Sequence, residues 1–399
     1  MLNRRAYLRA SAAFLGLGLS TELVSRVGGG VGRSGGAGAW LSAGRLSAAE
    51  PLSDEAVRQY EQMVTKAIDY LRSKGQAADG SYSATAGPGV TALVTAAILK
   101  HGRSPDDPQV AKSLKYLEGF LQEDGGLNAA TSKHRNYETC LAIMAFKEAN
   151  KDGRYDKVLK KADGFLKLEQ WDESEGKDKS DPTFGGAGYG SKSRPDLSNT
   201  SFLIEALKAT GNKEDSEAIK RALLFVSRCQ NLESEHNTTP FPAKNPDGGF
   251  YYTPAAGGDS MAGKTENGGL RSYASMTYAG LKSMIFAGVG PDDPRVKAAV
   301  EWLKKNYDLN SNPGMGDAGL YYYFQMFAKS LEALGVSEFV DAKGVKHDWR
   351  AELRSELARR QRPDGSWVNP NSRWLEGDAN LVSAYALLAL ASCRVPAKK

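Results

Sequence analysis

The sequence predicts an all-α protein folded as an α6/α6 toroid, a ring of six helical hairpins. Two observations lead to this fold class: two kinds of helix alternate along the chain, and a recurring turn signature follows the helices of the first kind. The chain has 399 residues, 41% hydrophobic and 25% charged, which are the values of an ordinary globular protein. A single ring of repeats accounts for this length without dividing the chain into several domains.

Helices of the first kind have one apolar stripe and an opposite charged face. In the first of them Val57, Tyr60, Val64, Ile68 and Leu71 recur at the helical period, so one side is expected to pack and the other to face water. Comparable stretches are expected at 109–121, 155–166, 213–229, 294–306 and 348–360.

Helices of the second kind are apolar nearly all round, which is typical of helices buried on most faces. Four of them read TALVTAAIL (91–99), CLAIMAF (140–146), SFLIEAL (201–207) and AYALLALA (384–391). Two more are expected to begin near Tyr273 and Leu320. Six buried and six amphipathic helices in alternation predict an inner ring surrounded by an outer ring.

The turn signature is most complete in the stretch ELARRQRPDGSW, where Gln361, Gly365 and Trp367 follow a helix. Looser copies follow other helices, at Gln76, Gln122, Gln170 and Gln230. We expect Gln361 to satisfy backbone carbonyls at the end of its own helix, and Trp367 to stack under the next hairpin. The signature is therefore interpreted as structural.

Two loops contain the tetrapeptide Pro-Asp-Asp-Pro, at 105–108 and 291–294. An Asp followed by Pro at the first helical position caps free amides and presets the backbone. We expect Asp107 and Asp293 to act as N-caps. The alternative is a metal or diphosphate site that uses these two residues with Asp106 and Asp292.

The first 39 residues resemble a signal peptide of the twin-arginine type. Arg4 and Arg5 precede a short apolar stretch that is too brief to span a bilayer. We expect residues 1–39 to direct export through the twin-arginine machinery to the periplasm or beyond, residues 40–52 to form a linker, and residues 53–395 to form the toroid. Removal of five arginines and one glutamate lowers the net charge from +5 to +1.

This near-neutral mature chain has no basic stripe with interleaved aromatic residues, so nucleic acid is not an expected partner. No segment after the signal has the apolar length of a transmembrane helix. Cys140, Cys229 and Cys393 lie far apart inside helical patterns. They are expected to be small buried groups, not members of a disulfide framework.

With Gln361, Gly365 and Trp367 in this setting, residues 55–393 resemble the superfamily of squalene-hopene cyclases and prenyltransferase β-subunits. The resemblance implies a terpenoid cyclase-like α/α toroid with prenyltransferase or squalene cyclase-like repeats. It also implies an isoprenoid or another lipid that is bound or converted in a central cavity. An active protein would then be a cyclase or mutase, that is, an isomerase or a transferase.

The cyclases of this superfamily carry an Asp-x-Asp-Asp-Thr segment whose central Asp protonates a double bond. The matching segment here runs from Asp196 to Thr200, with Ser198 and Asn199 in place of two carboxylates. Protonation of an alkene needs a strong, supported acid. Asp196 matches only the flanking acid, so hopene-type protonation is not expected, and we interpret Asp196, Ser198 or Asn199 as an N-cap of the following helix.

The prenyltransferases of the superfamily bind zinc through an Asp and a Cys on one inner helix and a His on another. Of the four histidines only His134 comes near an inner helix, and no Asp-x-Cys segment accompanies it. The ligand set is incomplete. We therefore expect neither a metal nor another cofactor.

In a ring of hairpins all inner helices begin at one rim, where their free amides would point at an occupant. We expect the site there. The candidate catalytic acids are Glu138, Asp196 and Asp378. The candidate substrate-binding residues are Tyr137, Asn199, Arg271, Tyr273, Asp317, Tyr321, Tyr322, Trp374 and Asn380.

Two alternatives remain open for this rim. Carboxylates from separate helices would also suit a periplasmic glycan-active enzyme, in which an acid and a base flank a sugar. The ring would otherwise be a non-catalytic scaffold for a protein or a polymer, with its acids serving only as helix caps. The long loop 245–270 either lies over the rim as a lid or is a disordered excursion.

Overall fold

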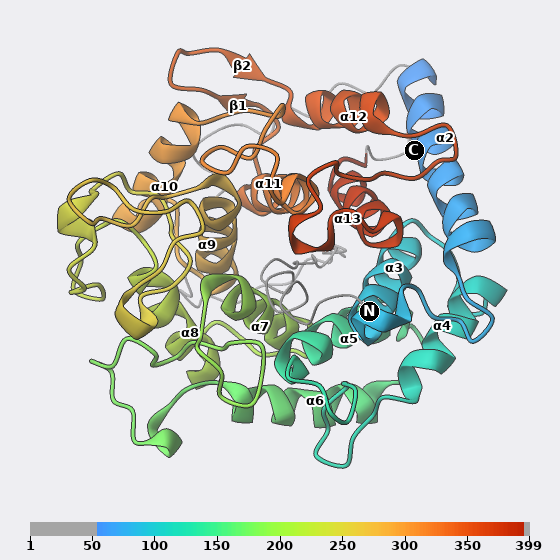
Figure 1. Cartoon of the computed structure of the whole chain (residues 1–399), viewed down its shortest axis with the longest axis horizontal. Coiled ribbons are helices and arrows are strands. Elements are labelled where there is room, and N and C mark those ends of the chain that lie inside the picture. Colours follow the sequence, from blue (N-terminus) through green and yellow to red (C-terminus); the bar gives the residue numbers. More distant parts are fainter. Residues whose placement is uncertain (1–53, 395–399) are drawn as a thin grey trace, which may run out of the picture.

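The computed structural model describes residues 54–394, which form a closed ring of twelve α-helices (Figure 1). The inner helices are α3 (Pro88–Lys100), α5 (Arg135–Ala149), α7 (Leu197–Ala209), α9 (Ala274–Phe286), α11 (Leu320–Leu334) and α13 (Ala379–Ser392). The outer helices are α2 (Asp54–Tyr70), α4 (Pro108–Glu118), α6 (Asp156–Glu169), α8 (Glu217–Arg228), α10 (Pro294–Lys305) and α12 (Trp349–Arg360). The expected signal peptide and linker lie outside the described residues.

The inner ring is continuous because each inner helix packs against two inner neighbours, and α13 packs against α3 to close the circle. Every residue of α3 except its last, Lys100, is buried. The outer helices bury one face only: in α6 the buried set includes Leu159, Ala162 and Phe165. The predicted alternation of buried and amphipathic helices is thus confirmed.

A short antiparallel pair, β1 (Phe339–Val340) and β2 (Lys346–His347), precedes α12. None of the helices within residues 54–394 is both long enough and apolar enough to cross a membrane. The three cysteines are buried and unpaired, as expected.

The glutamine of the turn signature joins neighbouring outer helices. Gln361 Nε2 donates to the Met63 carbonyl of α2 at 2.9 Å and to the Gly365 carbonyl of its own turn. Gln170 and Gln230 likewise reach Ala218 and Arg295 in the next outer helices. Gln361 does bond to its own helix end, but through its backbone N–H, which donates to the Leu357 and Ala358 carbonyls; its side chain leaves α12.

The glycine and the tryptophan of the signature pack the same turn against neighbouring helices. Gly365 has φ 90°, and a Cβ there would collide with the Lys66 carbonyl of α2, so the turn lies directly on the next outer helix. Trp367 is fully buried between α12 and α13, where its Nε1 donates to the Leu357 carbonyl at 2.8 Å. It packs within its own hairpin, not under the next one.

The Asp-Pro loops are N-caps. Asp107 accepts a bond from Gln109 N at 2.9 Å, and Asp293 accepts one from Arg295 N at 2.8 Å. In both helices Pro occupies the first position. These carboxylates therefore have the local role that the sequence predicted.

Candidate functional site

Six tyrosines converge in the space enclosed by the six inner helices, here called the lumen, and all but Tyr385 lie near the ends where these helices begin. The tyrosine cluster consists of Tyr137, Tyr189, Tyr252, Tyr273, Tyr322 and Tyr385. The ring centroids of Tyr137 and Tyr189 lie 6.0 Å apart, and those of Tyr322 and Tyr385 lie 6.2 Å apart. Ser198 Oγ and Tyr322 Oη lie 3.1 Å apart. Since α7 and α11 are separated by α9, this bond spans the lumen.

Asp196 lies among these rings as the N-cap of α7. It is 1% exposed and accepts bonds from the backbone N and the Nδ2 of Asn199, both at 2.8 Å. The side chain of Tyr252 also bonds to it. Burial raises the pKa of Asp196 to about 6 although these bonds oppose the shift. The capping role is present, and the same carboxyl exchanges its proton near neutral pH.

The tyrosines stay protonated in this environment. Burial raises the pKa of Tyr189, Tyr252 and Tyr322, and the negative charge of Asp196 raises it further. A neutral tyrosine offers an apolar ring face and one hydroxyl. The cluster is therefore an aromatic surface with hydroxyl edges and one titratable carboxyl.

Glu138 is a second buried acid, in the first turn of α5. Its carboxylate accepts bonds from Ala129 N at 3.0 Å and Ser132 Oγ at 2.8 Å. Burial raises its pKa to about 7. A Cβ on Gly87 would lie 2.8 Å from its Oε1. Glu138 thus shapes the loop before its own helix.

The third predicted acid, Asp378, is the N-cap of α13. It accepts bonds from Asn380 N at 2.9 Å and Leu381 N at 3.0 Å. The Nδ2 of Asn380 donates to Ser83 Oγ at 3.0 Å. Asp378 therefore caps α13, and Asn380 connects α13 to the turn that precedes α3.

Another acid, Glu376, caps α11. Its Oε1 accepts from Tyr321 N at 3.0 Å and Tyr322 N at 2.9 Å, and burial raises its pKa to about 7. At α9, Ala274 N donates to the Pro313 carbonyl at 2.9 Å. The expectation of free amides at the rim is therefore wrong for these helices. Buried amides need partners, and neighbouring chain supplies them.

The structure brings five of the predicted residues together: Asp196, Asn199, Tyr137, Tyr273 and Tyr322. Burial raises the pKa of Tyr273, and its electrostatic interactions with Tyr322 and Asp196, which raise it further, place it beside them. These five residues come from three inner helices and the cap of a fourth.

The other predicted residues face elsewhere. Arg271 is exposed and donates through Nε to the Lys264 carbonyl at 3.0 Å. Asp317 is also exposed. Tyr321 packs against Phe324 with ring centroids 5.6 Å apart. Trp374 is buried, with the Arg373 guanidinium 4.1 Å from its ring centroid.

Sequence reasoning missed Tyr189, Tyr252 and Tyr385 as site residues. Tyr189 and Tyr252 each lie four residues after the glycine of a turn signature, at Gly185 and Gly248. An alignment of the turn signatures on their glycines would have placed Tyr189 and Tyr252 at the same position of the repeat. The loop 245–270 folds into short turns, pinned by bridges such as Thr253 to Asp259, and it supplies Tyr252.

A second polar group, the ion cluster, lies deeper in the lumen and consists of Glu205 of α7, Lys282 of α9 and Lys329 of α11. Lys282 Nζ lies 2.8 Å from Glu205 Oε2, and Lys329 Nζ contacts the other oxygen. Glu205 and Lys329 follow Ser198 and Tyr322 by seven residues, which is about 10 Å along a helix. All three are at most 4% exposed.

Within residues 54–394, His, Cys, Asp and Glu side chains form no group suited to a metal ion.

Comparison with solved structures identifies the architecture. A possible member of the GH105 family from Salmonella enterica is 11% identical, with 86% of this chain and 95% of that chain covered and a TM-score of 0.51. A family 76 glycoside hydrolase from Bacteroides thetaiotaomicron is 13% identical, with 84% and 77% covered and a TM-score of 0.51. The chain is an α/α toroid.

The type II terpene cyclase MstE from Scytonema is similar to the toroid at 14% identity, with 84% and 98% covered and a TM-score of 0.49. No family model matches the sequence, and no curated protein matches it. The likenesses to solved structures show the fold alone at these identities. That fold is the toroid that the resemblance in sequence implied.

Proposed function

We propose that the toroid binds an isoprenoid or another lipid against the tyrosine cluster, with Asp196 next to the polar end of that molecule. The observation that supports this proposal is the convergence of six tyrosines around one buried acid inside the ring. Aromatic faces attract hydrocarbon by apolar contact, and they also stabilise a positively charged carbon.

The strength of the acid limits the chemistry that we propose. An unactivated alkene is protonated only by a strong acid, whereas burial makes Asp196 a weaker acid than usual. Ser198 replaces the carboxylate at the donor position of the cyclase segment. We therefore propose binding, with proton transfer between Asp196 and an oxygen of the ligand as the reaction this site supports.

The place of action is a further part of the proposal. The twin-arginine pattern of residues 1–39 supports export of the toroid to the periplasm or beyond. Fusion of these residues to a reporter that requires folded export would test it. A reporter that stays in the cytoplasm, together with an unchanged result when Arg4 and Arg5 are replaced by Lys, would contradict it.

The direct test of binding is extraction of the purified mature chain followed by mass spectrometry, and titration with geranylgeraniol. We expect retained lipid, and saturable binding that Tyr322→Ala weakens about tenfold, which corresponds to 1.4 kcal/mol. The matched control is Tyr116→Ala, since Tyr116 lies half-buried on the outer helix α4.

Asp196→Asn separates binding from proton transfer, because Asn keeps the size and the capping ability of Asp. We expect it to retain geranylgeraniol and to lose the dependence of binding on pH around 6. A lipid-free protein that binds oligosaccharide in place of geranylgeraniol would overturn the proposal and favour the glycan alternative.

A further inference from the structure

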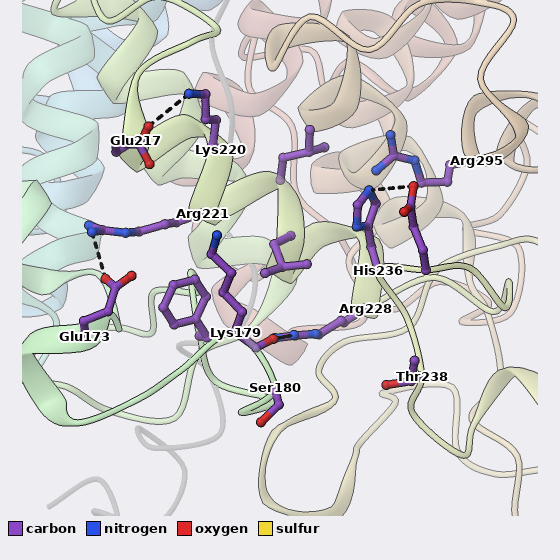
Figure 2. Close-up of a pocket in the computed structure, with 14 residues that line it drawn as sticks. Glu173, Lys179, Ser180, Glu217, Lys220, Arg221, Arg228, His236, Thr238 and Arg295 are labelled. Carbon is purple, nitrogen blue, oxygen red and sulfur yellow. Dashed lines mark hydrogen bonds and ion pairs between the residues drawn. The ribbon is translucent and has the colours of Figure 1, made fainter.

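A pocket of about 670 Å³ lies on the outer side of the ring, lined by α8 and by loop residues 173–184 and 235–238 (Figure 2). This volume is typical of sites for small molecules. Its residues belong to the outer layer, so the pocket does not depend on the tyrosine cluster or on the function proposed for it.

The exposed face of α8 forms one wall of this pocket. Glu217, Arg221, Leu224 and Arg228 follow one another at intervals of four, three and four residues, which places them on one helical face. Leu224 and its neighbour Leu223 are partly exposed. The wall therefore combines cationic groups with an apolar strip.

Two of the lining arginines are already neutralised. Arg221 pairs with Asp172 and with Glu173, both at 2.8 Å. Arg295 pairs with Asp293 at 2.7 Å. A bidentate or doubled contact of this kind fixes a guanidinium and balances its charge.

Arg228 is held differently. It is 6% exposed, and it donates through Nη1 to the Asp181 carbonyl at 2.7 Å and through Nη2 to the Lys179 carbonyl. Among residues 54–394 no carboxylate forms an ion pair with it. Burial lowers the pKa of Arg228. The negative charge of the Asp181 carboxylate, which forms no ion pair with Arg228, opposes this shift. Arg228 is therefore a buried cation whose hydrogen bonds go to neutral carbonyls, with no carboxylate in direct contact.

Lys179 is the second cation of the pocket that is not in direct contact with a carboxylate. Its backbone carbonyl accepts from Arg228, and its side chain rises into the pocket beside that residue (Figure 2). In the described part of the chain it forms no ion pair. The acids Glu217 and Glu235 are 72% and 86% exposed and stand at the rim. The buried charge of the pocket is therefore the guanidinium of Arg228, whereas Lys179 and the two acids are exposed.

We propose that this pocket binds a small organic anion, whose carboxylate or phosphate group is held between Lys179 and Arg228. The guanidinium has five N–H donors and spends two on the carbonyls, so donors remain for the ligand. The rest of the molecule lies on Leu223 and Leu224. A ligand with an acidic group and a partly apolar body, such as an acidic sugar, fits this arrangement.

Three probes on one sugar scaffold test the proposal: glucuronate, glucose 6-phosphate and glucose. We expect calorimetry at low salt to show binding of at least one anion, with glucose at least about tenfold weaker and the affinity falling as salt rises. Preference for glucuronate or for glucose 6-phosphate tells whether the natural group is a carboxylate or a phosphate.

The test variant is Lys179→Ala, because Lys179 is exposed and its loss leaves Arg228 bonded to the same backbone carbonyl. We expect it to weaken anion binding about tenfold. Lys220→Ala is the matched control, since Lys220 lines the same pocket but already pairs with Glu217 at 2.9 Å. Equal binding of all three sugars, equal effects of the two variants, or no binding at millimolar concentrations would overturn the proposal. None of these results bears on the binding of geranylgeraniol in the lumen.

Discussion

The tyrosine cluster and the ion cluster are two buried polar regions of one lumen, and they stabilise their charged groups by opposite means. In the tyrosine cluster, Asp196 accepts hydrogen bonds only from neutral donors, on Asn199 and Tyr252. In the ion cluster, Glu205 faces two ammonium groups. The acid Asp196 can therefore become neutral within a bonded network, whereas Glu205 is held in direct contact with Lys282 and Lys329.

This difference assigns the two regions different roles. A carboxyl whose pKa is near 6 and whose partners are hydroxyl and amide groups can exchange a proton without losing its surroundings. A carboxylate shared by two lysines is a structural tie between α7, α9 and α11. We therefore look for ligand chemistry in the tyrosine cluster and for stability in the ion cluster.

The largest effect is expected from Glu205→Gln, which leaves Lys282 and Lys329 buried against a neutral amide. Loss of one partner from a buried ion group costs about 3–5 kcal/mol. Urea denaturation at neutral pH measures it. The control is Glu214→Gln, which breaks the exposed pair with Lys208 and should cost less than about 1 kcal/mol. Equal losses in the two variants would remove the distinction between the regions.

The dependence of stability on pH should have a minimum near pH 7. Asp196 and Glu376 have raised pKa values of about 6 and about 7. The folded protein therefore binds protons at these two carboxyls more tightly than the unfolded chain does. The resulting stabilisation is complete below about pH 4 and is lost as the pH rises through 6 to 7. Burial lowers the pKa of Lys282 to about 7. Its contribution is complete above about pH 10 and is lost as the pH falls to 7.

Two variants sharpen this prediction, since each unit of pKa shift corresponds to about 1.4 kcal/mol. Asp196→Asn should flatten the acidic arm of the profile, and Lys282→Met should flatten the alkaline arm. Unfolding free energies measured between pH 4 and pH 10 test both. A profile that rises or falls steadily across this range would contradict the assignment.

The smallest effect is expected from Tyr322→Phe, which keeps the ring and removes the hydroxyl that meets Ser198 across the lumen. Loss of one such hydrogen bond costs about 1 kcal/mol. A double-mutant cycle with Ser198→Ala isolates the pair. Additive losses in that cycle would show that the two hydroxyls do not stabilise each other.

The ring could be predicted from the sequence because helical periodicity is local, and helices such as 91–99 and 384–391 are apolar on every face. Asp196 and Tyr322 could be placed near the starts of inner helices because the apolar stretches that follow them show where α7 and α11 begin. Arg271 and Asp317 precede their helices, and their side-chain directions depend on the conformation of the preceding loop.

The ion cluster could not be predicted in the same way. Glu205 interrupts an apolar stretch, and its partners Lys282 and Lys329 lie 77 and 124 residues away. These side chains come into contact only because α7, α9 and α11 are arranged around one axis and each turns the relevant face inward. The partner of Gln361 was missed for a similar reason, since Met63 is 298 residues distant.

The bond from Gln361 to Met63 joins the last hairpin to the first outer helix. Figure 1 shows α2 next to α12 and α13, where the ring closes. An open array of repeats can fray from its ends one unit at a time, because each unit touches only its neighbours. A circle has no terminal unit. Each hairpin here is held from both sides, so cooperative unfolding of the whole ring replaces stepwise fraying, and α2 acquires its last neighbours only after α13 has been synthesised.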